Sequence, residues 1–256
     1  MSKKAILLVS FGTIDFQTRK KCIYNITENI TDFFTDYKVF TAFSSKFIIS
    51  KLKSMGENIF GVEDALDEIL KADFSEVIIQ PTFLTDGEEY HRLIKISEKY
   101  KDKIKIYIGK PILYYEEDYN KIALLLIKQT EKTKDTITVF MGHGNENIYG
   151  KTYFKIQETL DNMGINNIFI TTVEGEPSFK TIVDKISKNT SVSLQPLMIV
   201  SGEHAKNDMA GNDDESLKNL FIKKGCTVSC IIKGLGEIFE ISEIIREHII
   251  KSKNDL

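Results

Sequence analysis

Three side chains that can bind a divalent metal each follow an apolar, strand-like run in the second half of the sequence. They are His143 after residues 137–142, Glu174 after residues 168–173, and His204 after residues 194–200. The three positions are 31 and 30 residues apart, about the length of one strand, one helix and their loops. Successive strands of a parallel sheet end at the same edge, where such folds bind ligands. Two imidazoles and a carboxylate are therefore expected to converge there as a site for Zn, Co, Ni or Fe.

Each of these residues also has an ordinary structural interpretation. His143, between Gly142 and Gly144, would then only hydrogen-bond a neighbouring loop. Glu174 would cap the helix expected to begin near Pro177, since carboxylates favour helix N-termini. His204 precedes a polar stretch that predicts a solvated loop under either interpretation. The convergence of three candidates favours a functional role, and histidine is also a base near neutral pH.

Glu89 is a fourth candidate, in the first half of the chain. It lies in Gly-Glu-Glu-Tyr-His, residues 87–91, at the position equivalent to His204 when the two halves are aligned. It would serve as a base or as a carboxylate near the metal. The alternative is a charge in the first turn of a helix. His91 and His248 fall on helical patterns and are expected to be surface or structural residues.

The composition is that of a water-soluble protein. The chain has 256 residues, of which 42% are hydrophobic and 28% charged, and a formal net charge of −3 argues against broad nucleic-acid binding. No segment approaches the roughly 20 apolar residues that span a membrane, so we expect a cytoplasmic protein. Cys22, Cys226 and Cys230 are expected to be buried thiols in a reducing compartment. A metal pair at the last two would lack a turn and further cysteine ligands.

Eight strand-like runs alternate with amphipathic stretches. The runs are 4–11, 37–43, 75–82, 104–109, 136–142, 166–173, 191–200 and 226–233. Helical spacing of apolar residues appears in 62–70, 87–100, 118–129, 149–163 and 237–250, and a further helix is expected at 215–224. Strands alternating with helices of this length predict βαβ units and parallel sheets.

The two halves of the sequence resemble each other. Gln80-Pro81 and Gln195-Pro196 are each followed, after five residues, by Gly-Glu, with an offset of 115 residues. Three further segment pairs match, 9–12 with 141–144, 39–44 with 169–174, and 106–109 with 231–234. The prediction is an α/β fold of two similar lobes, each a four-stranded parallel sheet flanked by helices, with a cleft between them. The expected lobes are residues 1–120 and 121–256, the second carrying most of the metal-site residues.

The duplication sharpens the interpretation of the three candidates. At the equivalent strand ends the first half has Phe11, Ser44 and Glu89. The backbone geometry of these positions therefore does not require histidine or glutamate. We accordingly interpret the ligand set of the second half as chemistry rather than as a demand of the fold.

At these residues the chain resembles the anaerobic-type sirohydrochlorin cobaltochelatases of the CbiK type, in the class II chelatase superfamily with ferrochelatase. The resemblance runs almost end to end. Its most specific part is Gly-Glu-His-Ala-Lys-Asn-Asp-Met-Ala at 202–210, followed by Gly-Leu-Gly-Glu at 234–237. It departs from relatives that often have a second histidine soon after Gly-His-Gly, where this chain has Asn145-Glu146-Asn147. Glu203 also replaces a common aspartate.

The resemblance implies insertion of Co²⁺ into sirohydrochlorin during anaerobic cobalamin synthesis. It assigns metal binding to His143, Glu174 and His204, proton acceptance also to His143, and a further acidic active-site position to Glu89. It implies a tetrapyrrole and a divalent metal as partners, with Co²⁺ as substrate and no permanently bound cofactor. Nucleic acid and membrane are not expected as partners, and the oligomeric state stays open, a homo-oligomer included.

Two alternative functions stay open at the level of sequence. The first keeps the chemistry and changes the substrates, to iron or nickel insertion or to a related tetrapyrrole, since affinity order alone does not select cobalt. The second is a non-enzymatic haem or metal carrier, in which His143 would serve as an axial ligand.

Overall fold

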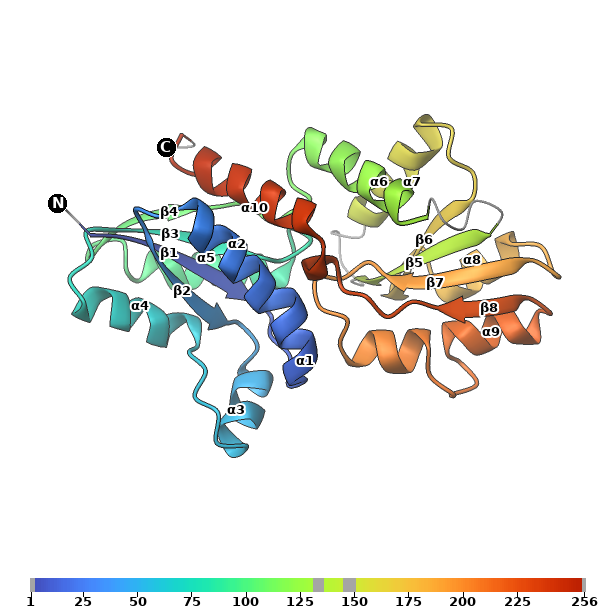
Figure 1. Cartoon of the computed structure of the whole chain (residues 1–256), viewed down its shortest axis with the longest axis horizontal. Coiled ribbons are helices and arrows are strands. Elements are labelled where there is room, and N and C mark those ends of the chain that lie inside the picture. Colours follow the sequence, from blue (N-terminus) through green and yellow to red (C-terminus); the bar gives the residue numbers. More distant parts are fainter. Residues whose placement is uncertain (1–2, 131–135, 145–150, 255–256) are drawn as a thin grey trace. The chain divides into compact units, whose positions relative to one another are not determined.

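The chain folds into two compact units, each built around a parallel sheet (Figure 1). The computed structural model describes residues 3–130, 136–144 and 151–254. The first unit comprises Met1–Tyr114 and Gly236–Leu256, and the second comprises Tyr115–Leu235. Both sheets have four strands, as the sequence predicts.

The first sheet contains β1 (Lys4–Ser10), β2 (Lys38–Phe43), β3 (Glu76–Pro81) and β4 (Lys105–Ile108) in the order β2-β1-β3-β4. The second contains β5 (Ile137–Gly144), β6 (Ile168–Glu174), β7 (Ser191–Pro196) and β8 (Thr227–Cys230) in the order β6-β5-β7-β8. All neighbouring strands are parallel. The two orders are the same once the strands of each half are renumbered, which supports the internal duplication.

The expected strand positions agree with the structure except at the ends of β7 and β8. Residues 197–200 and 231–233, predicted as strand, lie outside the ladder. The ladder pairs Ile79 with Ile108 in the first unit and Leu194 with Cys230 in the second. Cys230 is therefore the equivalent of Ile108, and the alignment of 106–109 with 231–234 was wrong by three residues. An apolar run continues past the strand here, so hydrophobicity alone did not mark where pairing stops.

The helices that follow the strands account for the sequence periodicity. Those at the predicted positions are α4 (Val62–Lys71), α5 (Glu88–Glu98), α6 (Glu116–Thr130), α7 (Lys151–Asn162), α8 (Phe179–Lys185), α9 (Leu217–Lys223) and α10 (Phe239–Lys251). The expected start of α7 at residues 149–150 lies outside the described residues. Elements not anticipated are α1 (Phe16–Thr18), the π-helix η1 (Arg19–Tyr24), α2 (Asn25–Phe33), α3 (Lys46–Ser54), the π-helix η4 (Ala205–Met209) and the 3₁₀-helix η5 (Leu235–Glu237).

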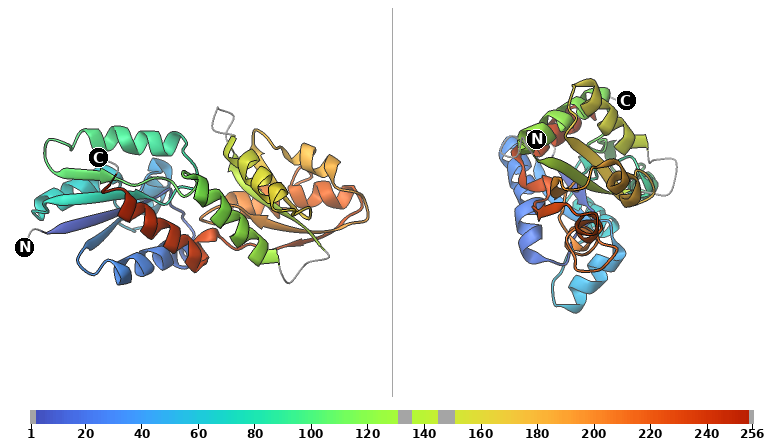
Figure 2. Two further views of the ribbon diagram at one scale, coloured as in Figure 1. Left: turned by 90° about the horizontal axis from the view of Figure 1, so that it is seen from above. Right: turned by 90° about the vertical axis from the view of Figure 1, so that its right-hand side faces the viewer.

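The helix that follows the fourth strand of each half belongs to the other unit. α6 follows β4 in sequence but packs on α7, and α10 follows β8 but contacts α2 and β3 (Figure 2). The compact units therefore differ from the expected division at residue 120, because residues 236–256 join the first unit. The physical reason is burial, since Ile241, Ile244 and Ile245 lie on the buried face of α10. A division of the sequence at a single residue cannot place the C-terminal helix α10 in the first unit.

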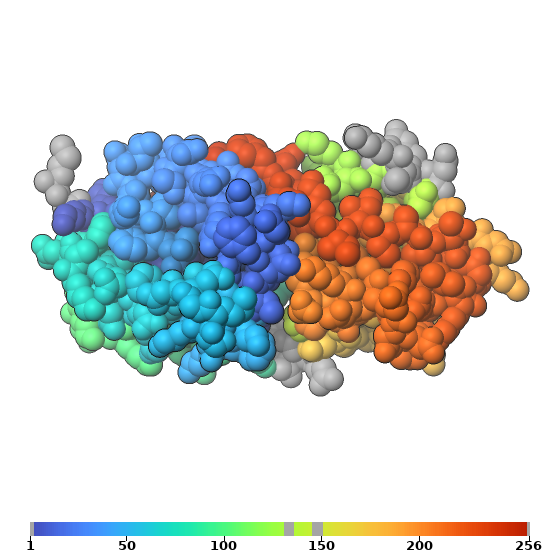
Figure 3. All heavy atoms as spheres, turned by 60° about the horizontal axis from the view of Figure 1, so that its bottom comes forward, coloured from blue at the N-terminus to red at the C-terminus, as the bar shows by residue number. Residues whose placement is uncertain are grey.

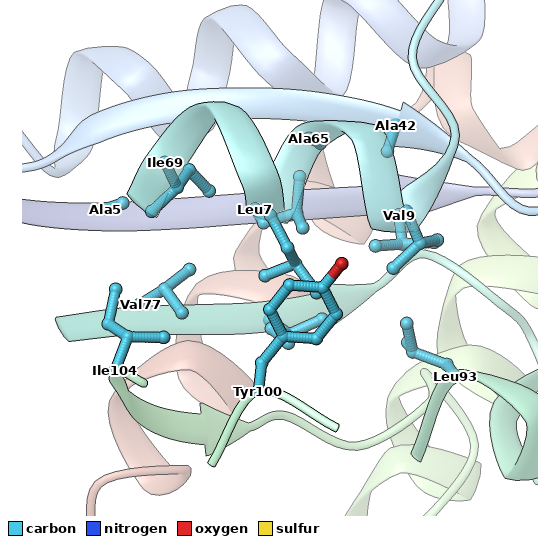
Figure 4. Packing of buried hydrophobic residues seen from close by; sticks show 13 residues of the cluster. Ala5, Leu7, Val9, Ala42, Ala65, Ile69, Val77, Leu93, Tyr100 and Ile104 are labelled. Carbon is cyan, nitrogen blue, oxygen red and sulfur yellow. The ribbon is translucent and has the colours of Figure 1, made fainter. Parts of the chain in front are cut away.

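Side chains alternate between the two faces of the first sheet, as they must along a strand. Leu7 and Val9 of β1 point into a core completed by α4 and α5, where Tyr100 and Leu93 pack against them (Figure 4). Ile6 and Leu8 are equally buried and belong to the opposite face. Helices thus cover both faces, which is the usual condition of an all-parallel sheet. Among the helices of the described residues, none is long and apolar enough to cross a membrane.

Arg246 joins α10 to α2. Its guanidinium lies 4.7 Å from the ring centroid of Phe33 and 5.1 Å from that of Phe239, and it donates a hydrogen bond to the carbonyl oxygen of Asn29. Arg246→Ala should lower the free energy of unfolding by about 1–2 kcal/mol, because the cation–π contacts and a charged hydrogen bond are lost. Denaturant unfolding monitored by circular dichroism measures this change.

The matched control is Glu243→Ala, an exposed position on the same helix. It should change the free energy of unfolding by no more than about 0.5 kcal/mol. Equal stabilities of the two variants would show that Arg246 does not hold α10 in place.

Candidate metal-handling site

The carboxyl ends of three neighbouring strands position the candidate residues of the second unit. β5 lies between β6 and β7, so its end has a neighbour on each side. His143 is the last residue but one of β5, and Glu174 is the last residue of β6. His204 follows β7 after a short loop and precedes η4. The order of the strands therefore makes His143 the central member of the set.

Two glycines give the backbone around His143 its shape. A Cβ on Gly142 would lie 2.1 Å from the ring of Tyr153, so the absence of a side chain lets that ring pack on the strand. Gly144 has φ +83°, and a Cβ there would lie 1.8 Å from the carbonyl oxygen of Glu174. Glycine is thus required twice, for close approach and for a left-handed backbone. The His143 side chain is left half exposed between them.

Tyr153 supports this turn from α7. Its ring is buried, and its hydroxyl accepts a hydrogen bond from the backbone N–H of Gly144 at 3.4 Å. Burial raises the pKa of the Tyr153 phenol, so the hydroxyl stays protonated. The aromatic ring and the hydroxyl together fix both glycines that flank His143.

Glu174 is held by pairing rather than used as a helix cap. Its backbone pairs with that of Gly144, and the chain turns back so that the N–H of Thr172 donates to the carbonyl oxygen of Pro177 at 2.8 Å. The N-cap of α8 is Ser178, whose hydroxyl accepts from the N–H of Thr181. The carboxylate of Glu176 accepts from the N–H of Ser178, which lowers its pKa. The capping interpretation of Glu174 was therefore wrong, and its half-exposed carboxylate is available for other contacts.

His204 begins a helical segment that is anchored in the core. Ala205 and Met209 of η4 are fully buried against β7 and α9, whereas His204 itself is partly exposed. Its Nδ1 lies 2.8 Å from a carboxylate oxygen of Asp208. Residues 203–209 of the polar run are helical, contrary to the expected loop, whereas residues 210–216 are bends and turns, as expected. Residues 203–224, orange in Figure 3, are visible at the surface of the second unit.

The structure brings His143 close to both of its expected companions. His143 Nδ1 lies 3.9 Å from a carboxylate oxygen of Glu174, and the rings of His143 and His204 have centroids 4.6 Å apart. Two donors that bind one ion at about 2.1 Å each are at most about 4.2 Å apart, so His143 and Glu174 are within sharing distance of an ion. Across the described ranges, no group of three or more His, Cys, Asp or Glu side chains is placed to hold one metal ion, so the expected three-ligand set is not assembled in this structure. The pairwise distances therefore carry the metal-site proposal.

Glu89 lies in the first unit, at the start of α5, as its proposed equivalence to His204 requires. It is in the first turn of the helix after Gly87, and one carboxylate oxygen contacts Arg92. The other oxygen is buried and has no hydrogen-bond partner among the described residues. Its position satisfies the first-turn interpretation and leaves an acceptor for a ligand. Its catalytic role stays a prediction.

The remaining equivalents differ in chemistry from the second unit. Phe11, at the position equivalent to His143, is 49% exposed. In the first unit, extension of the β1–β2 register pairs Ser44 with Phe11. In the second unit, Glu174 pairs with Gly144, which is the equivalent of Gly12 rather than of Phe11. Ser44 is thus the equivalent of Val173, one residue away from the sequence alignment.

The other two histidines have structural surroundings, as expected, and two of the three cysteines are buried, as expected. His248 is buried, with Nδ1 3.1 Å from the carbonyl oxygen of Lys110, and His91 lies 3.3 Å from the carboxylate of Asp86. Cys22, Cys226 and Cys230, all within the described residues, form no disulfide. The first two are buried, whereas Cys230 is only half buried, and burial raises its pKa. Residues 145–147, where the sequence departs from its relatives, lie outside the described residues.

Comparison with known proteins identifies the family. A family model described as "Cobalt chelatase (CbiK)" matches residues 4–254. The chain belongs to this family. It is 31% identical to the sirohydrochlorin cobaltochelatase of Salmonella typhimurium, over 98% of this chain and 97% of that protein. The sirohydrochlorin cobaltochelatase CbiKC of Nitratidesulfovibrio vulgaris is 25% identical, over 97% of this chain and 90% of that protein.

Solved structures place the CbiK-family chain in the chelatase fold. The sirohydrochlorin chelatase SirB from Bacillus subtilis subspecies spizizenii, solved in complex with cobalt, superposes with a TM-score of 0.70 and 13% identity. The match covers 99% of this chain and 97% of that chain. At this identity the likeness concerns the fold, and it confirms the predicted two-sheet architecture.

Substitution of Gly144 tests the close approach of the two strand ends. Gly144→Ala places a Cβ against the carbonyl oxygen of Glu174, so β5 and β6 must separate at the site. We expect it to lower the free energy of unfolding by roughly 3 kcal/mol and to reduce metal insertion, measured by denaturant unfolding and by tetrapyrrole absorbance.

Gly164→Ala is the matched control. Gly164 has φ +77°, but no atom lies within 4 Å of the added Cβ. It should therefore show only the cost of the left-handed backbone, about 1–2 kcal/mol, with normal activity. Similar losses of unfolding free energy and of metal insertion in both variants would show that the contact between residue 144 and the carbonyl oxygen of Glu174 does not matter.

Proposed function

We propose that the chain inserts Co²⁺ into sirohydrochlorin, with His143 at the centre of the metal-handling site. The proposal is supported by membership of the cobalt chelatase family and by two relatives named for this reaction. The observation that supports the site is the position of His143 near both other residues. Its Nδ1 lies 3.9 Å from a carboxylate oxygen of Glu174, and its ring centroid lies 4.6 Å from that of His204.

The reaction needs a base and a temporary holder for the metal. Co²⁺ enters as substrate with its water shell, and the product contains cobalt bound by four pyrrole nitrogens. Two protons leave the two pyrrole N–H groups, so charge balances with release of 2 H⁺. In the proposal, His143 accepts a proton while Glu174 and His204 hold Co²⁺. Imidazole nitrogen and carboxylate oxygen are suitable ligands for such an ion.

The exposure of these groups suits transfer of a metal rather than permanent retention. The side chains of His143 and Glu174 are 50% and 52% exposed, and that of His204 is 42% exposed. A hydrated ion reaches partly exposed donors and leaves them without unfolding the chain. A resident structural metal is usually enclosed by four protein ligands. We therefore propose no permanently bound cofactor, with Co²⁺ acting as substrate.

Some expectations from the sequence stay predictions. Glu89 is proposed as a second acidic group in the reaction, from the first unit. A cytoplasmic location and the lack of nucleic-acid or membrane partners are also proposals.

His143→Ala tests the central role of His143. We expect cobalt insertion to fall by a factor of about 10²–10⁴, because the variant lacks both the proton acceptor and a ligand. Insertion is followed by the absorbance change of sirohydrochlorin mixed with Co²⁺, and circular dichroism checks the fold. His91→Ala is the control for loss of a half-exposed histidine, and it should keep wild-type activity. Wild-type turnover by His143→Ala would refute the assignment.

The same assay distinguishes the alternative functions. Faster turnover with Fe²⁺ or Ni²⁺ than with Co²⁺ would assign a different metal to the same chemistry. Stoichiometric binding of the tetrapyrrole or the metal, without a metallated product, would indicate a carrier. Repeated turnover with Co²⁺ supports the cobaltochelatase.

A further inference from the structure

Each of the two site histidines has a carboxylate of its own. Glu174 lies beside His143, with 3.9 Å between His143 Nδ1 and a carboxylate oxygen, and Asp208 lies beside His204, with 2.8 Å between His204 Nδ1 and a carboxylate oxygen. The two contacts differ in kind. The first is too long for a hydrogen bond, whereas the second has the length of a strong one. Asp208 is therefore bonded to a site histidine, while Glu174 is free to bind a metal.

The π-helix η4 holds Asp208 in reach of His204. Ala205 and Met209, which follow His204 and Asp208 directly in the sequence, anchor the helix in the core. Gly211 closes the segment, because its N–H donates to the carbonyl oxygen of Asn207 at 3.0 Å and a Cβ there would lie 2.1 Å from that oxygen. A spacing of four residues puts both side chains on one helix face. The backbone thus places the two residues within reach of each other.

The neighbouring polar residues are engaged elsewhere. The carboxylate of Glu203 accepts a hydrogen bond from the side-chain amide of Asn207 at 3.1 Å. That pair is exposed and has the same four-residue spacing, one position earlier in the chain. Among the contacts of the described residues, Asp208 is the carboxylate bonded to the His204 ring.

We propose that Asp208 is a positioning residue that sets the tautomer and orientation of His204. The inference rests on the proposed function. The carboxylate accepts the Nδ1–H of His204, which leaves the lone pair on Nε2 for the substrate Co²⁺. A histidine that binds metal through one ring nitrogen commonly donates the other N–H to a carboxylate, which fixes the ring and increases its basicity. Asp208 would thus act on cobalt through His204.

The test compares Asp208→Ala with Asp208→Asn in the full chain. The chain has four histidines, so ¹⁵N-histidine NMR at mildly alkaline pH resolves the ring nitrogens, and His204→Ala assigns its signals. The wild type should show His204 protonated at Nδ1. Asp208→Ala should move the proton toward Nε2 and raise the Kd for Co²⁺ by about 10–100-fold in a titration with Co²⁺ alone.

Asp208→Asn retains an oxygen acceptor but loses the charge. It should restore the Nδ1–H signature and recover part of the affinity. The matched control is Asn207→Ala, an exposed neighbour in the same helix whose side-chain amide donates to Glu203, and it should leave both readouts at wild-type values.

The outcomes separate this inference from the proposed function. Unchanged tautomer and unchanged Kd in Asp208→Ala, together with weakened binding in His204→Ala, overturn the role of Asp208 alone. Unchanged cobalt binding in His204→Ala overturns the metal site on which the proposed function depends. A changed tautomer with an unchanged Kd shows that Asp208 orients the ring without aiding the metal, and this also overturns the inference.

Discussion

The approach of the β5 backbone to the carbonyl oxygen of Glu174 is the constraint on which the site depends. A side chain at Gly144 would occupy the space of that oxygen, so glycine allows the last residues of β5 and β6 to pair. On the other side of His143, the ring of Tyr153 packs in the space that a side chain at Gly142 would occupy. His143 is held between these two contacts. The backbone thus brings the positions of His143 and Glu174 together at the strand ends.

The same backbone device occurs in the first unit without the same chemistry. Gly12 also has a left-handed backbone, and a Cβ there would lie 2.5 Å from the ring of Phe43 in the adjacent strand. The residue before it is the exposed Phe11, in place of a histidine. The glycine therefore belongs to the shared architecture of the strand end. The units differ in the side chain before this glycine, which is phenylalanine in the first unit and histidine in the second.

The periodicity of apolar residues and the spacing of the strand-like runs predicted most of the fold, because both reflect which side chains are buried locally. Alternating strands and helices, and the repeated Gln-Pro pair, led to two four-stranded parallel sheets. The end of β8 and the membership of α10 were not predicted. An apolar run looks the same whether it pairs in a ladder or leaves it after Cys230. The buried face of α10 likewise does not reveal which sheet it covers.

For the candidate site, the sequence by itself determined which residue types stand at the strand ends, and the family to which they belong. Residue type and the spacing along the chain can be read from the sequence. Because neighbouring parallel strands end at the same edge, residues spaced by one strand, helix and loop come close together in space. Only the tertiary structure decided the contacts: that Ser178 caps α8 in place of Glu174, and that Asp208 bonds His204. These depend on ångström-scale positions set by core packing around η4 and by the turn after β6. A linear pattern has no information on such distances, because they arise from contacts among distant parts of the chain.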